Sequence, residues 1–192
     1  MKRFGIILAV IAVLLIVIFV YGLNVYNSLV LAQESVNTQW SQMETQYQRR
    51  YDLVPNLVSS VKGVLTQEQE IFGKIAEART QYGSATTPEQ KTLAADQLES
   101  SLSRLLVIVE NYPQLRSTET VQTLMSQLEG TENRISVERQ RYNDAVRSFN
   151  LNLRTFPRNV IARILGFGEK PYFNATPAAQ TVVPQVNLEL NK

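Results

Sequence analysis

The sequence of 192 residues contains no cysteine and no histidine. The missing cysteines exclude disulfides and thiolate nucleophiles, and the two absences together remove the side chains that hold most zinc, haem and non-haem iron sites. The most common general base is missing as well, so acid–base catalysis would depend on Asp, Glu, Lys or Tyr. We therefore expect no cofactor, no metal and no enzymatic activity.

The chain also lacks a large excess of charge of either sign, since its formal net charge is +2. Binding to nucleic acid requires a basic face toward the phosphate backbone, so we expect no nucleic-acid partner. The charges are nevertheless uneven along the chain. Residues 33–132 hold 8 Lys or Arg against 13 Asp or Glu, and residues 133–192 hold 9 against 4. This asymmetry suggests attraction within one bundle or between neighbouring subunits.

One long stretch has no charge at all. The segment FGIILAVIAVLLIVIFVYGL covers the twenty residues from Phe4 to Leu23, and a helix of about 20 apolar residues spans the hydrocarbon core of a bilayer. A cleaved signal peptide is the alternative, but its apolar core is usually about 7–15 residues and ends at small residues, and no A-x-A pattern follows here. We predict an uncleaved transmembrane helix from Phe4 to Val25, after a short flank at residues 1–3.

The charges that flank this helix predict its orientation. Lys2 and Arg3 lie on the N-terminal side, and the other side has no Lys or Arg before Arg49. By the positive-inside rule the N-terminus is cytoplasmic and the bulk of the chain is extracytoplasmic. A helix that continues out of the membrane would also delay the next charge.

Beyond the anchor, apolar residues recur three or four positions apart, with near-heptad character. The pattern predicts a first helix from about Glu34 to Tyr82 and a second from Pro88 to Glu110, capped by Thr87. It predicts a third from about Thr118 to Thr155 and a short fourth segment that Pro157 opens. The expected fold is all-α: a transmembrane helix, then a long antiparallel three- to four-helix bundle at residues 26–170, then a tail at 171–192. Within the tail, VVPQVNLEL would be extended or one short edge strand.

Two features of these helices leave alternatives open. Pro55 lies inside the first helix, which either passes through it with a kink or restarts there with Asp52 as its cap. We favour the continuous helix because the apolar stripe keeps its phase. The basic segment from Phe156 to Phe167 is amphipathic and fits either a membrane surface or the end of the bundle. We favour the bundle end, since apolar stripes of soluble helices mostly face cores.

Four sequence blocks beyond the predicted transmembrane helix resemble the LemA family. They are YNSLVLAQESVNTQWSQMETQYQRRYDLVPNLVSSVKGV, ENYPQLRS, GTENRISVERQRYNDAVRSFN and FPRNVIARILGFGEKPYF, in the family's order, and they extend over most of the chain from Tyr26 to Phe173. The resemblance implies a bacterial single-pass protein of the cytoplasmic membrane with a long helical bundle and no established enzymatic activity. It also implies a candidate partner, because such proteins are often encoded near TPM-domain membrane proteins.

The charged residues of these blocks form our candidate site. We expect a buried polar network between the first and third helices that fixes their register and adds little net stability. Its residues are Arg49, Arg50, Asp52, Pro55, Asn56, Glu132, Asn133, Arg134, Arg139, Tyr142, Asn143 and Asp144. A catalytic or ligand site made of the same charges is the alternative that we disfavour, because charge clusters can be purely structural.

The length of the first helix suggests the function. At about 1.5 Å per residue it would reach roughly 70 Å, and the second helix is about half as long. An apolar stripe that its own chain does not cover needs the third helix or another copy of the protein. We therefore expect a scaffold in the bacterial envelope that self-associates into homo-oligomers, in part as a coiled coil. An adaptor that binds another membrane protein, in envelope quality control or signalling, is the alternative.

Overall fold

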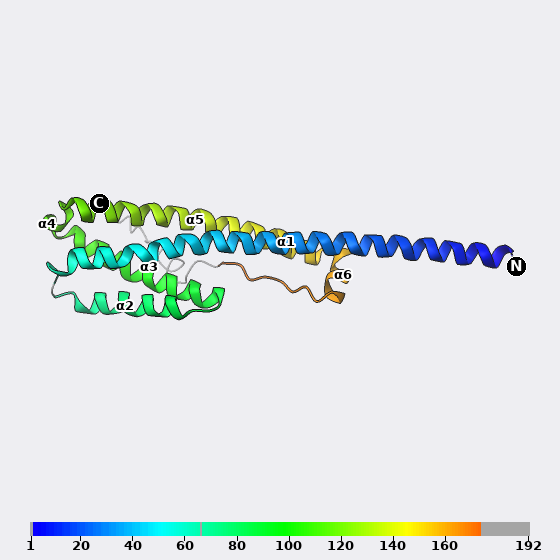
Figure 1. The fold of residues 1–192 in the computed structure, drawn as a ribbon, viewed down its shortest axis with the longest axis horizontal. Coiled ribbons are helices and arrows are strands. Elements are labelled where there is room, and N and C mark those ends of the chain that lie inside the picture. The colour runs from blue at the N-terminus through cyan, green and yellow to red at the C-terminus, as the bar shows by residue number, and fades with distance from the viewer. Residues whose placement is uncertain (1, 66, 174–192) are drawn as a thin grey trace, which may run out of the picture. The chain divides into compact units, whose positions relative to one another are not determined.

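The computed structural model describes residues 2–65 and 67–173, and within these ranges it contains helices and no strand (Figure 1). The helices are α1 (Lys2–Lys62), α2 (Gln69–Ser84), α3 (Pro88–Glu110), α4 (Pro113–Arg116), α5 (Glu119–Arg154) and α6 (Arg158–Ile164). The predicted all-α fold is confirmed. The segment VVPQVNLEL lies outside the described residues.

The start of α3 follows local sequence signals. Thr87 is the N-cap of α3, and its side chain accepts a hydrogen bond from the backbone N–H of Gln90. The Gln90 side chain in turn accepts from the backbone N–H of Thr87, so two unpaired donors of the first turn are satisfied in a capping box. Pro88 follows at the first helical position, where its missing N–H has no cost.

This capping box gives a direct prediction for stability. Thr87→Ala removes the side-chain acceptor, so we expect α3 to lose about 1 kcal/mol of stability, as is typical of N-cap threonines. Chemical denaturation would measure the loss, and hydrogen exchange of the first turn of α3 would locate it. Thr80→Ala is the matched control, because Thr80 is exposed and its hydroxyl only bonds the carbonyl of Ala76 in the same helix. An equal effect of both substitutions would contradict the assignment.

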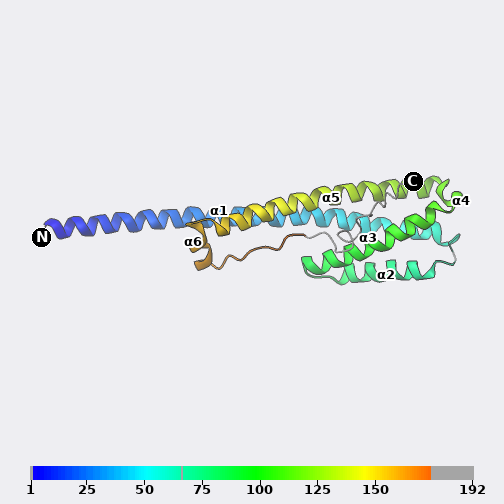
Figure 2. The ribbon, with the colours of Figure 1, turned by 180° about the vertical axis from the view of Figure 1, so that it is seen from behind.

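The expected first helix is interrupted, and the prediction of one helix from Glu34 to Tyr82 is wrong. α1 ends at Lys62, and α2 begins at Gln69. Gly63 follows directly, and glycine inside a helix costs about 1 kcal/mol relative to alanine. The break allows α2 to turn back and pack against α3 (Figures 1 and 2). Ile75 of α2 is buried there in the same apolar cluster as Val61 of α1.

α1 continues through Pro55 without a break. Asp52 lies inside the helix, so the interpretation in which Asp52 caps a new helix is wrong and the continuous helix is correct. The chain divides into two compact units, which we describe separately. The anchor unit comprises residues 2–46 and 134–173, and the bundle unit comprises the described residues between 47 and 133.

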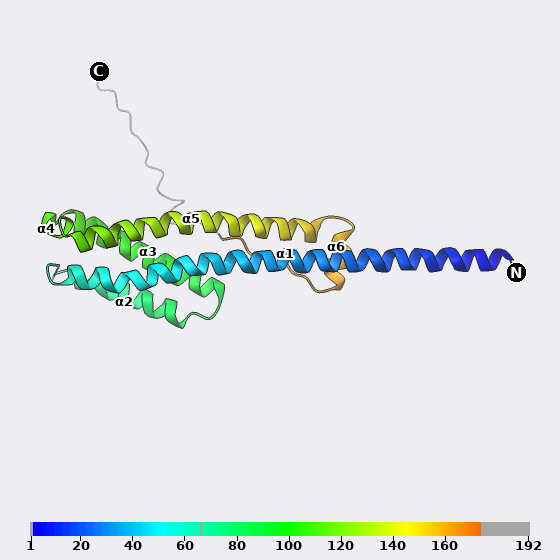
Figure 3. The same cartoon turned by 45° about the horizontal axis from the view of Figure 1, so that its top comes forward.

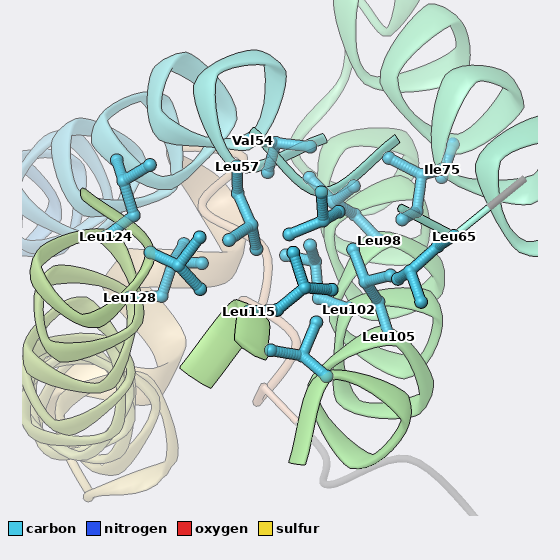
Figure 4. Packing of buried hydrophobic residues seen from close by; sticks show 14 residues of the cluster. Val54, Leu57, Leu65, Ile75, Leu98, Leu102, Leu105, Leu115, Leu124 and Leu128 are labelled. Atoms are coloured by element: carbon cyan, nitrogen blue, oxygen red, sulfur yellow. The ribbon is translucent and has the colours of Figure 1, made fainter. Parts of the chain in front are cut away.

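The bundle unit has an apolar core to which α1, α2, α3, α4 and α5 all contribute (Figure 4). Leucines dominate it, and α3 supplies Leu98, Leu102 and Leu105 from one face, at helical spacing. Leu115 of the short helix α4 closes the cluster between α3 and α5. The core holds these helices together, and so it sets the positions of the polar residues beside it.

The anchor unit is built where α5 and α6 pack against α1 (Figure 3). Phe149 of α5 is fully buried together with Leu29 of α1 and Ala162 of α6. Beyond α6, α1 continues alone toward its N-terminus, as the views from the front and from behind both show (Figures 1 and 2). Among the described residues, α1 is the one helix long and apolar enough to cross a membrane, and its most apolar stretch is not buried at all.

Candidate functional site: an arginine–glutamate cluster and an asparagine clamp

Arg50 is the buried charge of the bundle unit, with only 5 % of its surface exposed. It occupies the buried face of α1 between Tyr47 and Val54, which places its guanidinium among core residues. Its Nη2 donates to Glu132 of α5, and its Nη1 lies 3.5 Å from Oε2 of Glu99 on α3. The arginine therefore links three helices. Both glutamates keep partial access to solvent, with side-chain exposures of 32 % for Glu99 and 41 % for Glu132.

A hollow opens beside this cluster, with a cavity volume of about 440 Å³. Its apolar floor consists of Leu102, Leu106, Met125 and Leu128 from α3 and α5. Its polar lining consists of Arg50 with Ser103 and the carboxylates Glu99, Glu110, Glu129 and Glu132. Four carboxylates against one guanidinium make the hollow acidic, and its floor is apolar. This combination suits a positively charged group with an apolar neighbour.

Within the described ranges no group of His, Cys, Asp and Glu side chains could hold a metal ion. The cluster itself is a buried guanidinium that two acidic side chains pair, and these three side chains come from three different helices.

The structure separates the other predicted site residues of the bundle unit from this cluster. Arg49, Asp52 and Asn56 are exposed, and Pro55 is half-buried inside α1. Asp52 accepts a hydrogen bond from Nε2 of Gln48, one turn earlier in the same helix, at 2.9 Å. It does not pair with Arg50. Asn133 is exposed on α5, next to Glu132.

In the anchor unit the predicted residues also divide into two groups. Arg134 and Asp144 are exposed on α5. Arg139, Tyr142 and Asn143 meet the segment at 169–173 instead. The guanidinium of Arg139 lies 4.5 Å from the ring centroid of Phe173, a cation–π contact, and the Tyr142 hydroxyl donates to the carbonyl of Pro171 at 3.4 Å. The ring of Tyr142 also meets the ring of Trp40 edge to face.

Two asparagines of α5 hold this segment by its backbone, and we call the arrangement the asparagine clamp. Asn143 donates from Nδ2 to the carbonyl of Phe173 at 2.9 Å and accepts from its N–H at 2.8 Å. Asn150 does the same with Lys170, at 2.8 and 2.9 Å. Each amide therefore satisfies both backbone groups of one residue, as a neighbouring β-strand would. Asn143 and Asn150 are seven residues apart, so both face the same side of α5.

An ion pair holds the start of the same segment. Arg154 donates from Nε and Nη2 to the two carboxylate oxygens of Glu169, at 2.7 and 2.6 Å. These hydrogen bonds lower the pKa of the Glu169 carboxyl below its ordinary value, so the pair persists into mildly acidic conditions. Both side chains are largely exposed, so the pair orients the segment more than it stabilises the unit.

Glu99, Asn150 and the segment at 169–173 were not among the site residues predicted from the sequence. For Asn150 a signal was present, because it is buried on the stripe of α5 that includes Val146 and Leu153. A polar residue at such a position needs a partner, and an asparagine can serve both groups of a peptide backbone. For the segment itself no local signal exists, since its bonds come from its backbone.

Comparison with known proteins agrees with the resemblance of the sequence blocks. The model of the LemA family matches residues 39–188 of this chain. Two curated relatives from Paramagnetospirillum magneticum (strain ATCC 700264 / AMB-1), magnetosome proteins MamQ 1 and MamQ 2, are each 32 % identical over 95 % of this chain and 78 % of their own length. The magnetosome protein MamQ of Magnetospirillum gryphiswaldense (strain DSM 6361 / JCM 21280 / NBRC 15271 / MSR-1) is 30 % identical over 94 % of this chain and 77 % of its own.

Proposed function

The chain belongs to the LemA family, and from this premise we propose that it is a non-catalytic scaffold that associates with further copies of itself. It is a membrane-anchored helical protein, as the exposed apolar stretch of α1 and the named relatives together indicate. These relatives are named as magnetosome proteins. We further propose that the anchor lies in the bacterial cytoplasmic membrane with Lys2 and Arg3 on the cytoplasmic side.

The acidic hollow of the bundle unit is the main observation in support of self-association. A copy of this chain offers a suitable occupant, because residues 133–192 carry 9 Lys or Arg against 4 Asp or Glu. Arg147 is exposed among them. An arginine from a second copy would meet Glu110 and Glu129 at the rim, and its aliphatic stem would cover Met125 and Leu128.

The mass of the full-length protein, gently extracted from its own membrane at native levels, tests this proposal. We expect large, uniform particles that contain this chain alone. Glu110→Lys with Glu129→Lys should shift them to smaller species, because the hollow would then repel basic side chains. Glu77→Lys with Glu89→Lys is the matched control, since both residues are exposed in the same unit and neither lines the hollow.

Each other outcome would overturn the scaffold itself or the role of the hollow in it. A small particle with a stoichiometric second polypeptide would indicate an adaptor, for example for a TPM-domain protein, and the identity of the partner would then define the function. Monomers at native levels would exclude both assemblies. Particles that stay large with the hollow reversed in charge would place the self-association surface elsewhere.

A further inference from the structure

The helix α6 presents two different faces in the anchor unit. Ala162 is buried against α1 and α5, and Ile161 packs against the same cluster. The opposite side of α6 is apolar too, as is Phe156 just before the helix, and these side chains are largely exposed: Phe156 is 78 % exposed, Val160 51 % and Ile164 78 %. The inward face therefore caps the helices, as the sequence suggests. The outward apolar face remains to be explained.

The place of α6 along α1 supplies the explanation. α6 shares an apolar cluster with Val25 and Leu29 of α1, and in the loop after α6 the ring of Phe167 meets the ring of Tyr26 edge to face, with centroids 6.2 Å apart. The predicted span ends at Val25. At about 1.5 Å per residue, this part of α1 begins at the end of the span and reaches roughly 6 Å beyond it. The headgroup layer on each side of a bilayer is about 5–7 Å thick, so the contacts fall at its depth.

The charge at this depth is positive. Residues 154–170 include four Lys or Arg and one acidic residue, Glu169, which Arg154 pairs. Arg163 is exposed between Val160 and Ile164. Along α1 the first acidic residue after the span is Glu34, about 14 Å beyond Val25. Two tyrosines, Tyr21 and Tyr26, bracket the end of the span, as aromatic residues do at membrane surfaces.

We propose that α6 lies in the headgroup layer of an anionic bilayer, with the side chains of Phe156, Val160 and Ile164 inserted between lipids. The protein then has two contacts with the membrane, a helix that crosses it and a short helix that lies on it. The second contact fixes the angle at which α1 leaves the bilayer, because α6 packs on α1 directly beyond the span. The proposal depends on the membrane anchor and is independent of self-association.

Because the chain has no cysteine, single labelling sites test this proposal cleanly. Ile164→Cys, labelled with a fluorophore on the full-length chain in vesicles of phosphatidylcholine and phosphatidylglycerol, should be quenched several-fold more by lipids with a shallow nitroxide than Gln140→Cys. Gln140 is exposed on α5 of the same unit, which makes it the matched control. Ile11→Cys, inside the span, should be quenched by a deep nitroxide.

The three positions separate the possible failures. If Ile11→Cys is quenched and Ile164→Cys stays at the level of Gln140→Cys, the anchor stands and the proposal is overturned. If Ile11→Cys is not quenched, the anchor and the proposal fail together. Vesicles without phosphatidylglycerol should quench Ile164→Cys less, and Arg163→Glu should remove that difference. Equal quenching in both lipids would overturn the requirement for anionic headgroups.

Discussion

Replacing Glu99 and Glu132 together by alanine is expected to destabilise the bundle unit by about 3–5 kcal/mol, the cost of leaving a buried charge without a partner. The double substitution is needed because each glutamate contacts a different nitrogen of Arg50. One remaining carboxylate would still pair the guanidinium, so each single substitution should cost less. Chemical denaturation of the full-length protein in detergent, followed by circular dichroism, would measure the loss.

Arg50→Met should behave very differently, although it removes the same interactions. Methionine fills a similar volume in the apolar surroundings of Arg50, and the two carboxylates that it leaves behind can reach water. We expect a change in the free energy of unfolding within about 1 kcal/mol. One donor of Arg50, Nε, already has no hydrogen-bond partner within the described part of the chain, which lowers the benefit of the charged residue further.

Asp52→Ala is the matched control for this pair of experiments. If Asp52 belonged to the buried network predicted from the sequence, Asp52→Ala would leave an arginine unpaired and cost several kcal/mol. The structure places Asp52 on the exposed side of α1, where it bonds only to Gln48, so we now expect a change within about 0.5 kcal/mol. A large loss for Asp52→Ala, or an equal loss for Arg50→Met and the double glutamate variant, would contradict the assigned cluster.

The difference between Arg49 and Arg50 shows how much of the site could be predicted from the sequence. The two arginines are adjacent in the helix, so only one of them can face the apolar core of the unit. The buried residues of α1 run Met43, Tyr47, Val54 and Leu57, and position 50 continues this series at three- and four-residue steps. That spacing could be recognised in the sequence. The acidic partners of Arg50 could not, because Glu132 is 82 positions away and the register of the helices determines which of the many glutamates meets the arginine.

The helix limits also divide into those that the sequence could predict and those that it could not. Thr87, Pro88 and Pro113 act on their neighbours through local geometry, and so they predict the limits of α3 without knowledge of the fold. The end of α1 at Lys62 has only a glycine as its local signal. The apolar stripe continues across the turn, because Val61 and Ile75 enter the same core from both sides of it. Tertiary packing therefore decided this boundary.

Replacing both Asn143 and Asn150 by alanine is expected to release the segment at 169–173 from α5. The double substitution removes four hydrogen bonds, each with a net value of about 0.5–1.5 kcal/mol, so we expect a loss of about 2–6 kcal/mol in the anchor unit. Asn150 should contribute the larger part, because it is 3 % exposed and its backbone partners are then left without a bond in a buried setting.

Hydrogen exchange provides the local measurement of this effect. The N–H groups of Lys170 and Phe173 donate to the two asparagine side chains, so both amides should be protected in the wild-type protein and should exchange much faster in the double variant. Asn37→Ala is the control, because Asn37 is exposed and its side chain bonds only within its own helix. Unchanged protection at both amides would show that the clamp is not what holds the segment. Loss of protection would also bear on the membrane contact, because this segment connects α6 back to α5 and restrains the helix that we place on the bilayer.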